Sequence, residues 1–557
     1  MVFSDSDSDF SVFSEVSEVS ENVADTHFPL KPSKREWTKI AEMPTPLASQ
    51  FQALPGVVFP QPFQKPASYF LDFMSDQVVR GYCDATNKYA SSIFDNEKRR
   101  KSRQKLWLPI DVNEMKAFIA ELFLMGIVKK PSLKQYWSKR HMLSTPGIAE
   151  LFSRERFIMI YRVLDFRPVD HLQANQEEDV LFRIRPLLES VLTYFKSKYS
   201  PKRELTIDEC MIPFTGRHCL KQYMPLKPIK FGFKAFLLCE AESGYVLNWE
   251  LYTGGDTGEG SILQRTVTRL IEGYEGEEHF VYMDRFYTHP NIFAHLSKEK
   301  HIRCCGTVLT NRLGLTKQQN DQIKNLKDRE ILHFASNDDL LLVCWKDSKP
   351  VCVLTNIHGT SLKEVSRRVK KKRRQQHQTS QAREDIFIPE AIADFTMNMR
   401  GVDKFDQFTS FYSFAHKSKR WYLRVATHLL ELALVNTYIL YKKSVVSGKP
   451  ISQLDYRLEV IKELITPLRQ SKKLTSTAEK SLKRKDMEVG ETPISSNECY
   501  LDKIVDDKKK DCALCSRPPS ARKQTHFQCR TCGLPVCVIK CYDQHRLSRN
   551  KRGKVNC

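Results

Sequence analysis

The segment LTIDECMIPFTGR, residues 205–217, begins as a β-strand that carries an acidic side chain, Asp208, in its interior. The chain then reads as two further strands, at 234–240 and 246–252, and the sequence Glu242-Ser-Gly-Tyr supplies the turn between them. Helix and strand patterns alternate downstream, at residues 261–274, 279–284, 290–300 and 302–309. Three hairpin-connected strands are thus followed by two alternations of helix and strand.

This element order is that of an RNase H-like α/β sheet, in which the first and fourth strands lie side by side. Helical patterns flank the sheet on both sides. Upstream, Asp111 or Asn113 begins a helix with an apolar stripe, and further helices are expected near 154–164 and 181–199. Downstream, a helix is predicted over 395–407 and a long one over 420–443. Between them, from about 311 to 389, the alternation breaks around one hairpin, 340–345 with 350–356, and we interpret this stretch as an insertion.

The predicted fold class is therefore a multidomain α/β plus α protein: an RNase H-like core with an insertion, a split helical domain and a small C-terminal metal module. The expected boundaries are 1–57 for a disordered acidic and Pro-rich N-terminus, 58–203 for the first helical part, 204–310 for the first part of the core, 311–388 for the insertion, 389–412 for the second part of the core, 413–470 for the second helical part, 471–510 for a linker and 511–546 for a cysteine-rich module.

The chain of 557 residues carries a formal net charge of +22 and is 41% hydrophobic. This basic surplus suits a polyanionic partner such as nucleic acid, because each Lys or Arg that binds a phosphate releases counterions; a basic solvated surface is the alternative. No run of 18 apolar residues is present, so no membrane span is expected. The N-terminus is acidic and has no Lys or Arg before Lys31, which argues against a secretory signal. Most of the 16 cysteines lie either in apolar strand-like segments or in the C-terminal cluster, which favours a reducing compartment over disulfide formation.

Four acids have positions that suit metal-dependent chemistry. Asp208 lies in the first strand and Asp284 ends the fourth, so their carboxylates are expected to face each other. Asp403 and Asp406 lie three residues apart on a predicted helix and share one face. Phosphoryl transfer by two metal ions about 4 Å apart needs such carboxylates, which suit Mg²⁺ or Mn²⁺. For any one of these acids taken singly, a cap or a turn is the favoured interpretation; the acids count as a set.

Basic side chains follow the first strand in the segment KQYMPLKPIKFGFK, residues 221–234. Lys227, Lys230 and Lys234 are predicted to contact DNA phosphates beside the acids, and a solvated rim is the alternative. Arg217, Lys221 and Arg285 are weaker candidates for the same role. The run Arg367–Arg374 fits a nuclear-localisation signal, a DNA-gripping arm or a charged loop equally well.

The C-terminal region has the spacing of zinc ligands, because paired Cys-x2-Cys knuckles present two thiolates at tetrahedral geometry. Its seven secure ligands are Cys512, Cys515, Cys529, Cys532, Cys537, Cys541 and His545. Two complete sites need eight ligands, and His526 or Asp543 would supply the last one. A RING-like ubiquitin ligase module is the alternative, but the region lacks the usual Cys-x-His middle pair.

Five segments together resemble the piggyBac transposase family: LTIDECMIPFTGR, KQYMPLKPIKFGFK, VYMDRFYTHP (281–290), NMRGVDKFDQ (398–407) and the Cys/His region. The resemblance runs from about residue 58 to 546, in the order of the family. It implies that Asp208, Asp284 and Asp403 are a metal-binding catalytic triad and that Asp406 is an additional acid. It also implies that the flanking helices form a dimerisation and DNA-binding domain, and that the cysteine-rich module holds two interleaved zinc ions.

Arg420 and Trp421 are further candidates for DNA contact. The same resemblance places Trp421 near the active site as a platform for an unstacked base; a buried Trp at the end of a helix bundle is equally compatible. The family further implies cut-and-paste excision through a hairpin intermediate at TTAA sites, without a footprint. The expected partner is double-stranded DNA, both element ends and target, bound by a homodimer in the nucleus, with no small-molecule substrate. A domesticated descendant that binds DNA or chromatin without transposing is the competing hypothesis.

Overall fold

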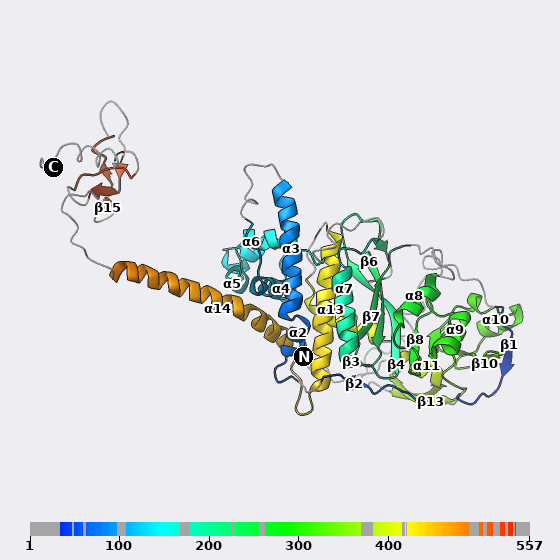
Figure 1. Cartoon of the computed structure of the whole chain (residues 1–557). Coiled ribbons are helices and arrows are strands. Elements are labelled where there is room, and N and C mark those ends of the chain that lie inside the picture. The colour runs from blue at the N-terminus through cyan, green and yellow to red at the C-terminus, as the bar shows by residue number, and fades with distance from the viewer. Residues whose placement is uncertain are drawn as a thin grey trace. The chain divides into compact units, whose positions relative to one another are not determined.

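The computed structural model describes residues 34–46, 50–59, 63–96, 107–167, 179–225, 227–254, 262–368, 383–414, 418, 420–488, 501–504, 509–515, 524–529, 533–538 and 541. The chain divides into two compact units, Met1–Gln470 and Ser471–Cys557, and helix α14 (Gln453–Glu488) crosses from one to the other. The first unit holds the predicted core and the helices around it (Figure 1).

The first unit is built around one sheet of ten strands, in the order β1-β10-β11-β12-β9-β8-β4-β6-β5, with β7 also paired to β6. Its strands are β1 (Trp37–Ile40), β4 (Glu204–Pro213), β5 (Gln222–Tyr223), β6 (Phe231–Glu240), β7 (Val246–Leu251), β8 (Phe280–Met283), β9 (Arg303–Thr307), β10 (Ile331–Ser336), β11 (Leu341–Lys346) and β12 (Pro350–Thr355). Smaller pairs are made by β2 (Gly56–Val57) with β3 (Tyr199–Ser200) and by β13 (Leu362–Arg368) with β14 (Arg383–Pro389).

The strand pairing predicted for the core is confirmed. β4, β6 and β7 form an antiparallel meander, and β4 lies parallel to β8, which lies parallel to β9. Because side chains alternate along a strand, Thr206, Asp208 and Cys210 of β4 lie on one face of the sheet and Ile207 and Glu209 on the other. β4 and its neighbour β6 are almost fully buried, as expected for strands covered on both faces.

Helices surround this sheet. The upstream set is α2 (Ser68–Phe73), α3 (Asp76–Asn96), α4 (Val112–Ile127), α5 (Pro146–Ala149), α6 (Arg154–Val163) and α7 (Arg185–Lys198). The others are α8 (Ile262–Leu270), α9 (Pro290–Lys300), α10 (Lys317–Lys324), α11 (Glu390–Asn398), α12 (Gly401–Tyr412) and α13 (Trp421–Ser444). Of the two predicted caps, Asp111 is the one that caps α4, since its side chain accepts a hydrogen bond from the Glu114 amide.

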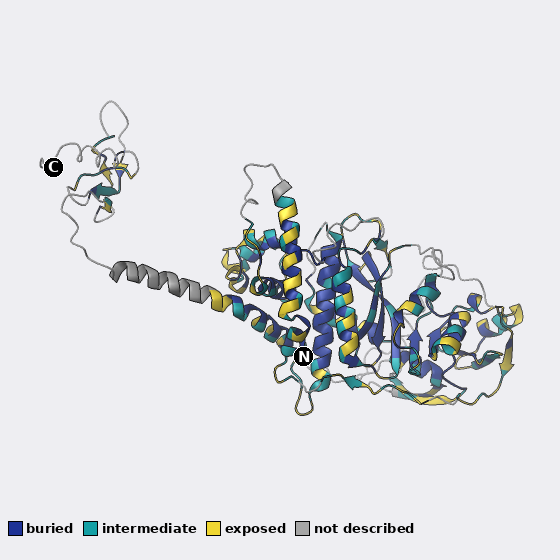
Figure 2. Cartoon of the chain, in the orientation of Figure 1, coloured by how far each residue is buried: buried dark blue, intermediate teal, exposed yellow. Residues whose placement is uncertain are grey.

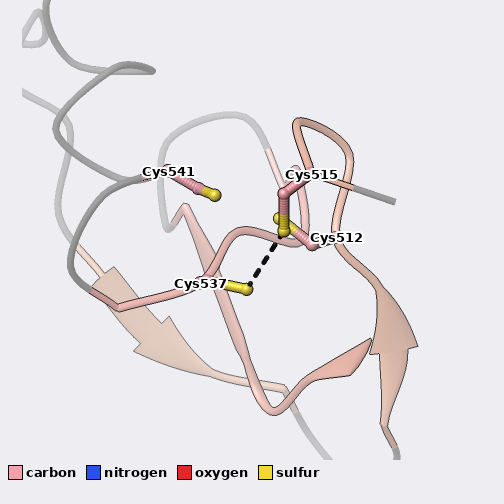
Figure 3. A group of neighbouring side chains, drawn as sticks. All are labelled: Cys512, Cys515, Cys537 and Cys541. Atoms are coloured by element: carbon pink, nitrogen blue, oxygen red, sulfur yellow. Dashed lines mark hydrogen bonds between the residues drawn. The ribbon is translucent and has the colours of Figure 1, made fainter. Parts of the chain in front are cut away.

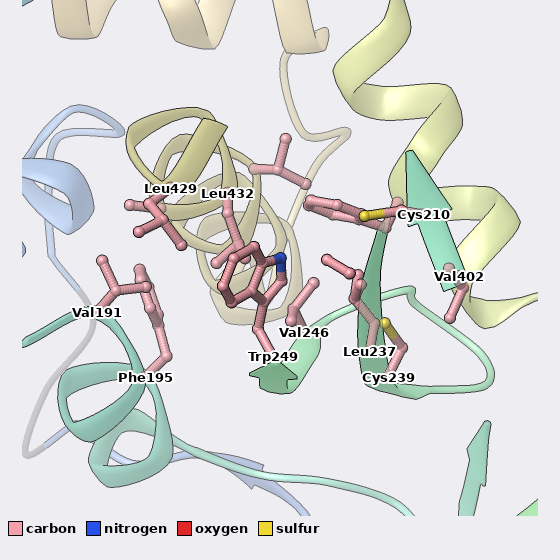
Figure 4. Close-up of a cluster of buried hydrophobic side chains, with 14 of the residues drawn as sticks. Val191, Phe195, Cys210, Leu237, Cys239, Val246, Trp249, Val402, Leu429 and Leu432 are labelled. Atoms are coloured by element: carbon pink, nitrogen blue, oxygen red, sulfur yellow. The ribbon is translucent and has the colours of Figure 1, made fainter. Parts of the chain in front are cut away.

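Helix α13 forms the centre of the helical part. It packs against α7 and α2 and reaches β4, and it is buried along almost its whole length (Figures 1 and 2). Leu429 and Leu432 of α13 meet Trp249 and Cys239 of the sheet in the cluster drawn in Figure 4, to which α12 adds Val402. α13 is long and apolar enough to cross a membrane, but its apolar residues are enclosed by the fold, the pattern of a core helix.

Three predictions need correction. The single helix expected over 395–407 is two helices, α11 and α12, because the chain turns at Met399 and Arg400 and the next residue, Gly401, is a poor residue for a helix interior. Residues 37–40, assigned to a disordered N-terminus, form β1, because Trp37 is buried and its indole Nε1 donates to Leu313 O at 2.8 Å. The segment interpreted as an insertion contributes β10–β12 to the core sheet itself, through the pairing of β12 with β9; its predicted hairpin is β11 with β12.

Candidate functional site

The four predicted acids gather at one face of the sheet. Asp208 lies in β4, Asp284 follows β8 directly, and the parallel register places Ile207 beside Met283, so the two acids are neighbours. Asp403 lies in the first turn of α12 and Asp406 one turn later, and α12 packs against β4 and β6. Strands and a helix from distant parts of the sequence therefore bring these four acids to neighbouring positions beside β4.

The acids influence one another electrostatically. Burial, the adjacent Glu209 and the negative charges of Asp284 and Asp403 raise the pKa of Asp208 well above its usual value, against the opposing charge of Lys227. Burial and Glu209 raise the pKa of Asp284 to about 6, although the Phe286 amide donates to its Oδ1 at 2.8 Å. Burial is also the main reason why the pKa of Asp406 rises to about 7. The pKa of Asp403 is raised as well, because neighbouring protein atoms remove part of the water around its carboxylate although the residue as a whole stays exposed.

These carboxylates fit a divalent cation. Their raised pKa values mean that the protein alone does not compensate their negative charges, and Asp208, Asp284 and Asp406 are half-buried while Asp403 is exposed, so the site is open to solvent. Hard oxygen ligands of this kind are those that Mg²⁺ and Mn²⁺ take. Asp208, Asp284 and Asp403 are the residues that would hold such ions, and Asp406 lies beside them.

Two glycines allow α12 to pack closely against its neighbours, the sheet at one end and α4 at the other. A Cβ atom on Gly401 would fall 2.2 Å from Thr206 Cγ2 and 3.0 Å from Glu240 O, so no other residue fits there without displacement. At the other end of α12, a Cβ on Gly126 of α4 would fall 1.9 Å from Tyr412 O. The helix that carries Asp403 and Asp406 is therefore in tight contact with β4 at its start and with α4 at its end.

Glu209, the residue after Asp208 in β4, was not identified from the sequence. Its carboxylate is buried, Lys227 Nζ lies 3.2 Å from its Oε1, Lys234 Nζ 3.8 Å from its Oε2, and the Tyr287 hydroxyl donates to Oε2 at 3.1 Å. Although burial opposes its charge, the two lysines hold the pKa of Glu209 at about 2. The sequence did contain a signal for Glu209: it is an acid adjacent to Asp208, and strand alternation places its side chain on the opposite face of β4.

The predicted DNA-contacting lysines have different surroundings. Lys230 is exposed and Lys227 half-buried, whereas Lys234 is buried, with its Nζ 4.2 Å from the ring of Phe286 and 4.9 Å from that of Phe236. A phosphate contact by Lys234 would require the side chain to leave Glu209 and both rings. The DNA-binding role of these three lysines, and of the half-buried Arg285, stays a prediction.

Arg420 and Trp421 lie where α13 begins. Arg420 Nη1 donates to Arg162 O, which ties the start of α13 to α6. The half-buried Trp421 ring lies 5.0 Å from the His218 ring and 6.2 Å from the Phe233 ring. The packing against His218 and Phe233 agrees with a Trp at the end of a helix bundle. Part of the Trp421 side chain is still exposed, and its role as a platform for a base stays a prediction.

In the second unit, Cys512, Cys515, Cys537 and Cys541 form a group whose sulfur atoms all lie within 4.8 Å of one another (Figure 3). This tetrad fits a tetrahedral zinc site. Burial disfavours the Cys512 thiolate, yet the amides of Leu514, Cys515 and Cys537 lower the pKa of this thiol to about 6, which prepares it as a ligand. The tetrad lies near four short strands, β15 (Leu501–Lys503), β16 (Lys510–Asp511), β17 (Gln524–Thr525) and β18 (Phe527–Cys529).

The tetrad joins Cys512 and Cys515 of the first knuckle to Cys537 and Cys541, which follow the second knuckle, the arrangement expected of an interleaved module. Cys529 is buried at the end of β18 and is outside the tetrad. Its predicted partners Cys532 and His545, and Asp543, one of the two candidates for the eighth ligand, lie outside the described residues. The second zinc ion stays a prediction.

Counting the zinc ions bound to the wild type and to variants tests both sites. We expect the full chain to carry about two zinc ions, and Cys512→Ser to lose about one of them and to unfold the second unit, because a structural zinc site contributes folding free energy directly. Zinc would be counted by elemental analysis of the purified protein. Cys219→Ser, which changes an exposed cysteine of the first unit, is the matched control and should keep both ions. Wild-type protein with no zinc would contradict the assignment, and one ion per chain would contradict the second site.

Comparison with known proteins gives consistent matches. A family model described as Transposase IS4 matches residues 65–438. The chain is 26% identical to human PiggyBac transposable element-derived protein 3 over 445 residues, which is 76% of this chain and 69% of that protein. It is 22% identical to human PiggyBac transposable element-derived protein 5, over 72% of this chain and 76% of that protein.

A solved structure, the cryo-EM structure of a piggyBac transposase synaptic complex with hairpin DNA, matches with a TM-score of 0.64. The match covers 87% of this chain and 98% of that chain at 19% identity. At this identity the similarity concerns the mixed α/β fold.

Proposed function

Because the chain belongs to the Transposase IS4 family and is of its piggyBac type, we propose that it is a DNA transposase that excises an element and inserts it elsewhere at TTAA sites. Membership of the family gives the chain a transposase-type function, with the nuclease and transferase kind of activity which that implies. The observation that carries the proposal is the convergence of Asp208, Asp284 and Asp403 from β4, β8 and α12 at one face of the sheet.

The proposed core is RNase H-like, and the strand order β7-β6-β4-β8-β9 supports it. Transposases of this class generally use divalent metals, and Mg²⁺ held by the three acids would stabilise the attacking and leaving oxygens during strand cleavage. Asp406 lies one helical turn beyond Asp403 and would orient the third ligand. Lys227, whose charge opposes that of all four acids, would limit the repulsion among them.

The proposed reaction has two displacements at phosphorus. In the first, a water oxygen forms a new P–O bond at the end of the element and the bridging 3′ oxygen leaves, takes up a proton and becomes a 3′-hydroxyl. In the second, this hydroxyl loses its proton and attacks the opposite strand, whose own 3′ oxygen leaves, so that the element end closes as a hairpin. The similar solved structure is a complex with hairpin DNA, which supports this second step.

The remaining parts have proposed roles in DNA handling. Residues 58–203 and 413–470 would form the split DNA-binding and dimerisation domain, and residues 511–546 a zinc module that binds element ends. The net charge of +22 supports a DNA partner, and the proposed site of action is the nucleus. The similar piggyBac transposase was solved as a synaptic complex with DNA, which supports the same partner for this chain.

An excision assay tests the proposal. The chain would be expressed in cells with a plasmid that carries a donor element, made from the repeats that flank its coding region and inserted at TTAA. We expect the element to leave and the TTAA to be restored without a footprint. No excision, from protein that still binds the element ends, would contradict transposition and favour the second candidate, a domesticated descendant that binds DNA or chromatin. The human relatives are named transposable element-derived proteins, which supports keeping that candidate.

A further inference from the structure

Lys404 lies between Asp403 and Asp406 in the sequence, yet its side chain bonds to a different part of the fold. Its half-buried ammonium donates two hydrogen bonds to main-chain carbonyl oxygens of the turn that joins β6 and β7: one to Ala241 O at 3.0 Å and one to Glu242 O at 2.7 Å. Charge-assisted bonds of this length are among the stronger ones in proteins. Lys404 therefore fastens the first turn of α12 to the core sheet.

The β6–β7 turn is shaped to receive α12. Gly244 has a φ of +75° and its amide donates to Glu240 O at 2.9 Å, which closes the turn. A Cβ atom on Gly244 would fall 2.9 Å from both Gly401 O and Lys404 Cβ, so the turn and the helix are in direct contact with no spare room. The two carbonyls that bind Lys404 belong to this same turn.

Further contacts hold the start of α12 against β4. The close approach of Gly401 to Thr206, and a hydrogen bond from Thr206 Oγ1 to Met399 O at 3.3 Å, set the start of the helix against β4, two residues before Asp208. Val402 and Phe405, on the face of α12 that packs on the core, are buried as well. Successive residues of an α-helix are about 100° apart around the axis, so a bond from residue 404 fixes the directions of residues 403 and 406.

We infer that Lys404 is a positioning residue, which sets the rotation of α12 and thereby aims the Asp403 carboxylate at Asp208 and Asp284. The inference rests on the proposed function, since it concerns the metal-binding role of Asp403. Lys404 acts through main-chain carbonyls and touches neither the acids nor the reacting atoms. Its loss should therefore weaken metal binding without removing a ligand.

Mn²⁺ binding to the full chain without DNA tests the inference. Electron paramagnetic resonance would measure free Mn²⁺ in a titration, and Asp208→Asn would define the signal that belongs to the acidic site. We expect Lys404→Met to weaken Mn²⁺ binding about 10-fold, the usual effect of losing a residue that orients a ligand, with a melting temperature close to that of the wild type. Lys404→Arg, which keeps a long cationic donor, should recover most of the affinity.

Lys202→Met is the matched control. Lys202 Nζ lies 2.8 Å from the Glu242 carboxylate on the same turn, so it binds the turn through a side chain and not through the carbonyls that hold α12. We expect this variant to bind Mn²⁺ like the wild type. Unchanged affinity in Lys404→Met, or equal losses in Lys404→Met and Lys202→Met, would overturn the inference. If Lys404→Met does not fold, Lys404→Gln replaces it with the same expected direction.

The same variants separate this inference from the proposed function. Hairpin formation on a pre-nicked element end would be measured against Mn²⁺ concentration. If wild-type protein binds Mn²⁺ through Asp208 but forms no hairpin, the transposase proposal fails while the role of Lys404 is still decided by the titration. Lys404→Met should need about 10-fold more Mn²⁺ for half-maximal hairpin formation and recover at saturation. A loss of activity that Mn²⁺ does not recover would contradict a positioning role.

Discussion

Asp208→Asn is expected to lower cleavage and strand transfer by about 10³-fold or more while DNA binding persists. Loss of a ligand to a catalytic metal removes several kcal/mol of transition-state stabilisation, and each 1.36 kcal/mol is a factor of ten in rate. Cleavage of a labelled element end would give the rate, and a gel-shift titration the binding. Equal cleavage by wild type and variant would refute the assignment of Asp208.

The stability of this variant supplies an independent check. The raised pKa of Asp208 means that its charge is disfavoured in the folded protein, because burial removes water from it and the charges of Glu209, Asp284 and Asp403 oppose it. Asparagine has almost the same volume and no charge, so without added Mg²⁺ or Mn²⁺ the variant should melt at the same temperature as the wild type or higher. Asp338→Asn, a change at a surface ion pair with Arg35, is the control and should keep full activity. A destabilised Asp208→Asn would mean that inactivity reflects misfolding.

Asp403→Asn is expected to eliminate strand cleavage, whereas Asp406→Asn should retain activity that Mn²⁺ partly restores. The two acids have different neighbours: the charge of Asp403 acts on Asp208, while that of Asp406 helps to raise the pKa of two buried thiols, Cys210 and Cys239. Asp403 is therefore the better candidate for the third ligand, and Asp406 for an acid that orients it.

A pre-nicked element end compares these two variants at the strand-transfer step alone. Hairpin product from Asp403→Asn, together with none from Asp406→Asn, would reverse the assignment. Normal product from both would place the third ligand elsewhere, and Glu209 would be the next carboxylate to replace, because its charge acts on both Asp208 and Asp284.

The family, the order of the core elements and the pairing of β4 with β8 were all predictable from the sequence. Strand alternation and the run of apolar residues in β4 and β8 are local properties, and so is the capping of α4 by Asp111. Because parallel neighbours end at the same edge of a sheet, the meeting of Asp208 and Asp284 followed from these local patterns. The cysteine spacing likewise predicted a metal module, and the described tetrad fits one.

Other features depend on contacts between residues far apart in the chain, and only the tertiary structure decided them. The break between α11 and α12 follows from the approach of Gly401 to Thr206, residues nearly 200 positions apart, and no local pattern contains that contact. The partners of Glu209 and Lys234 were hidden for the same reason, since alternation assigns Glu209 to a face but not to a neighbour. β10–β12 join the core because β12 finds hydrogen-bonding partners on β9, and a strand sequence alone does not specify which edge completes its backbone hydrogen bonds.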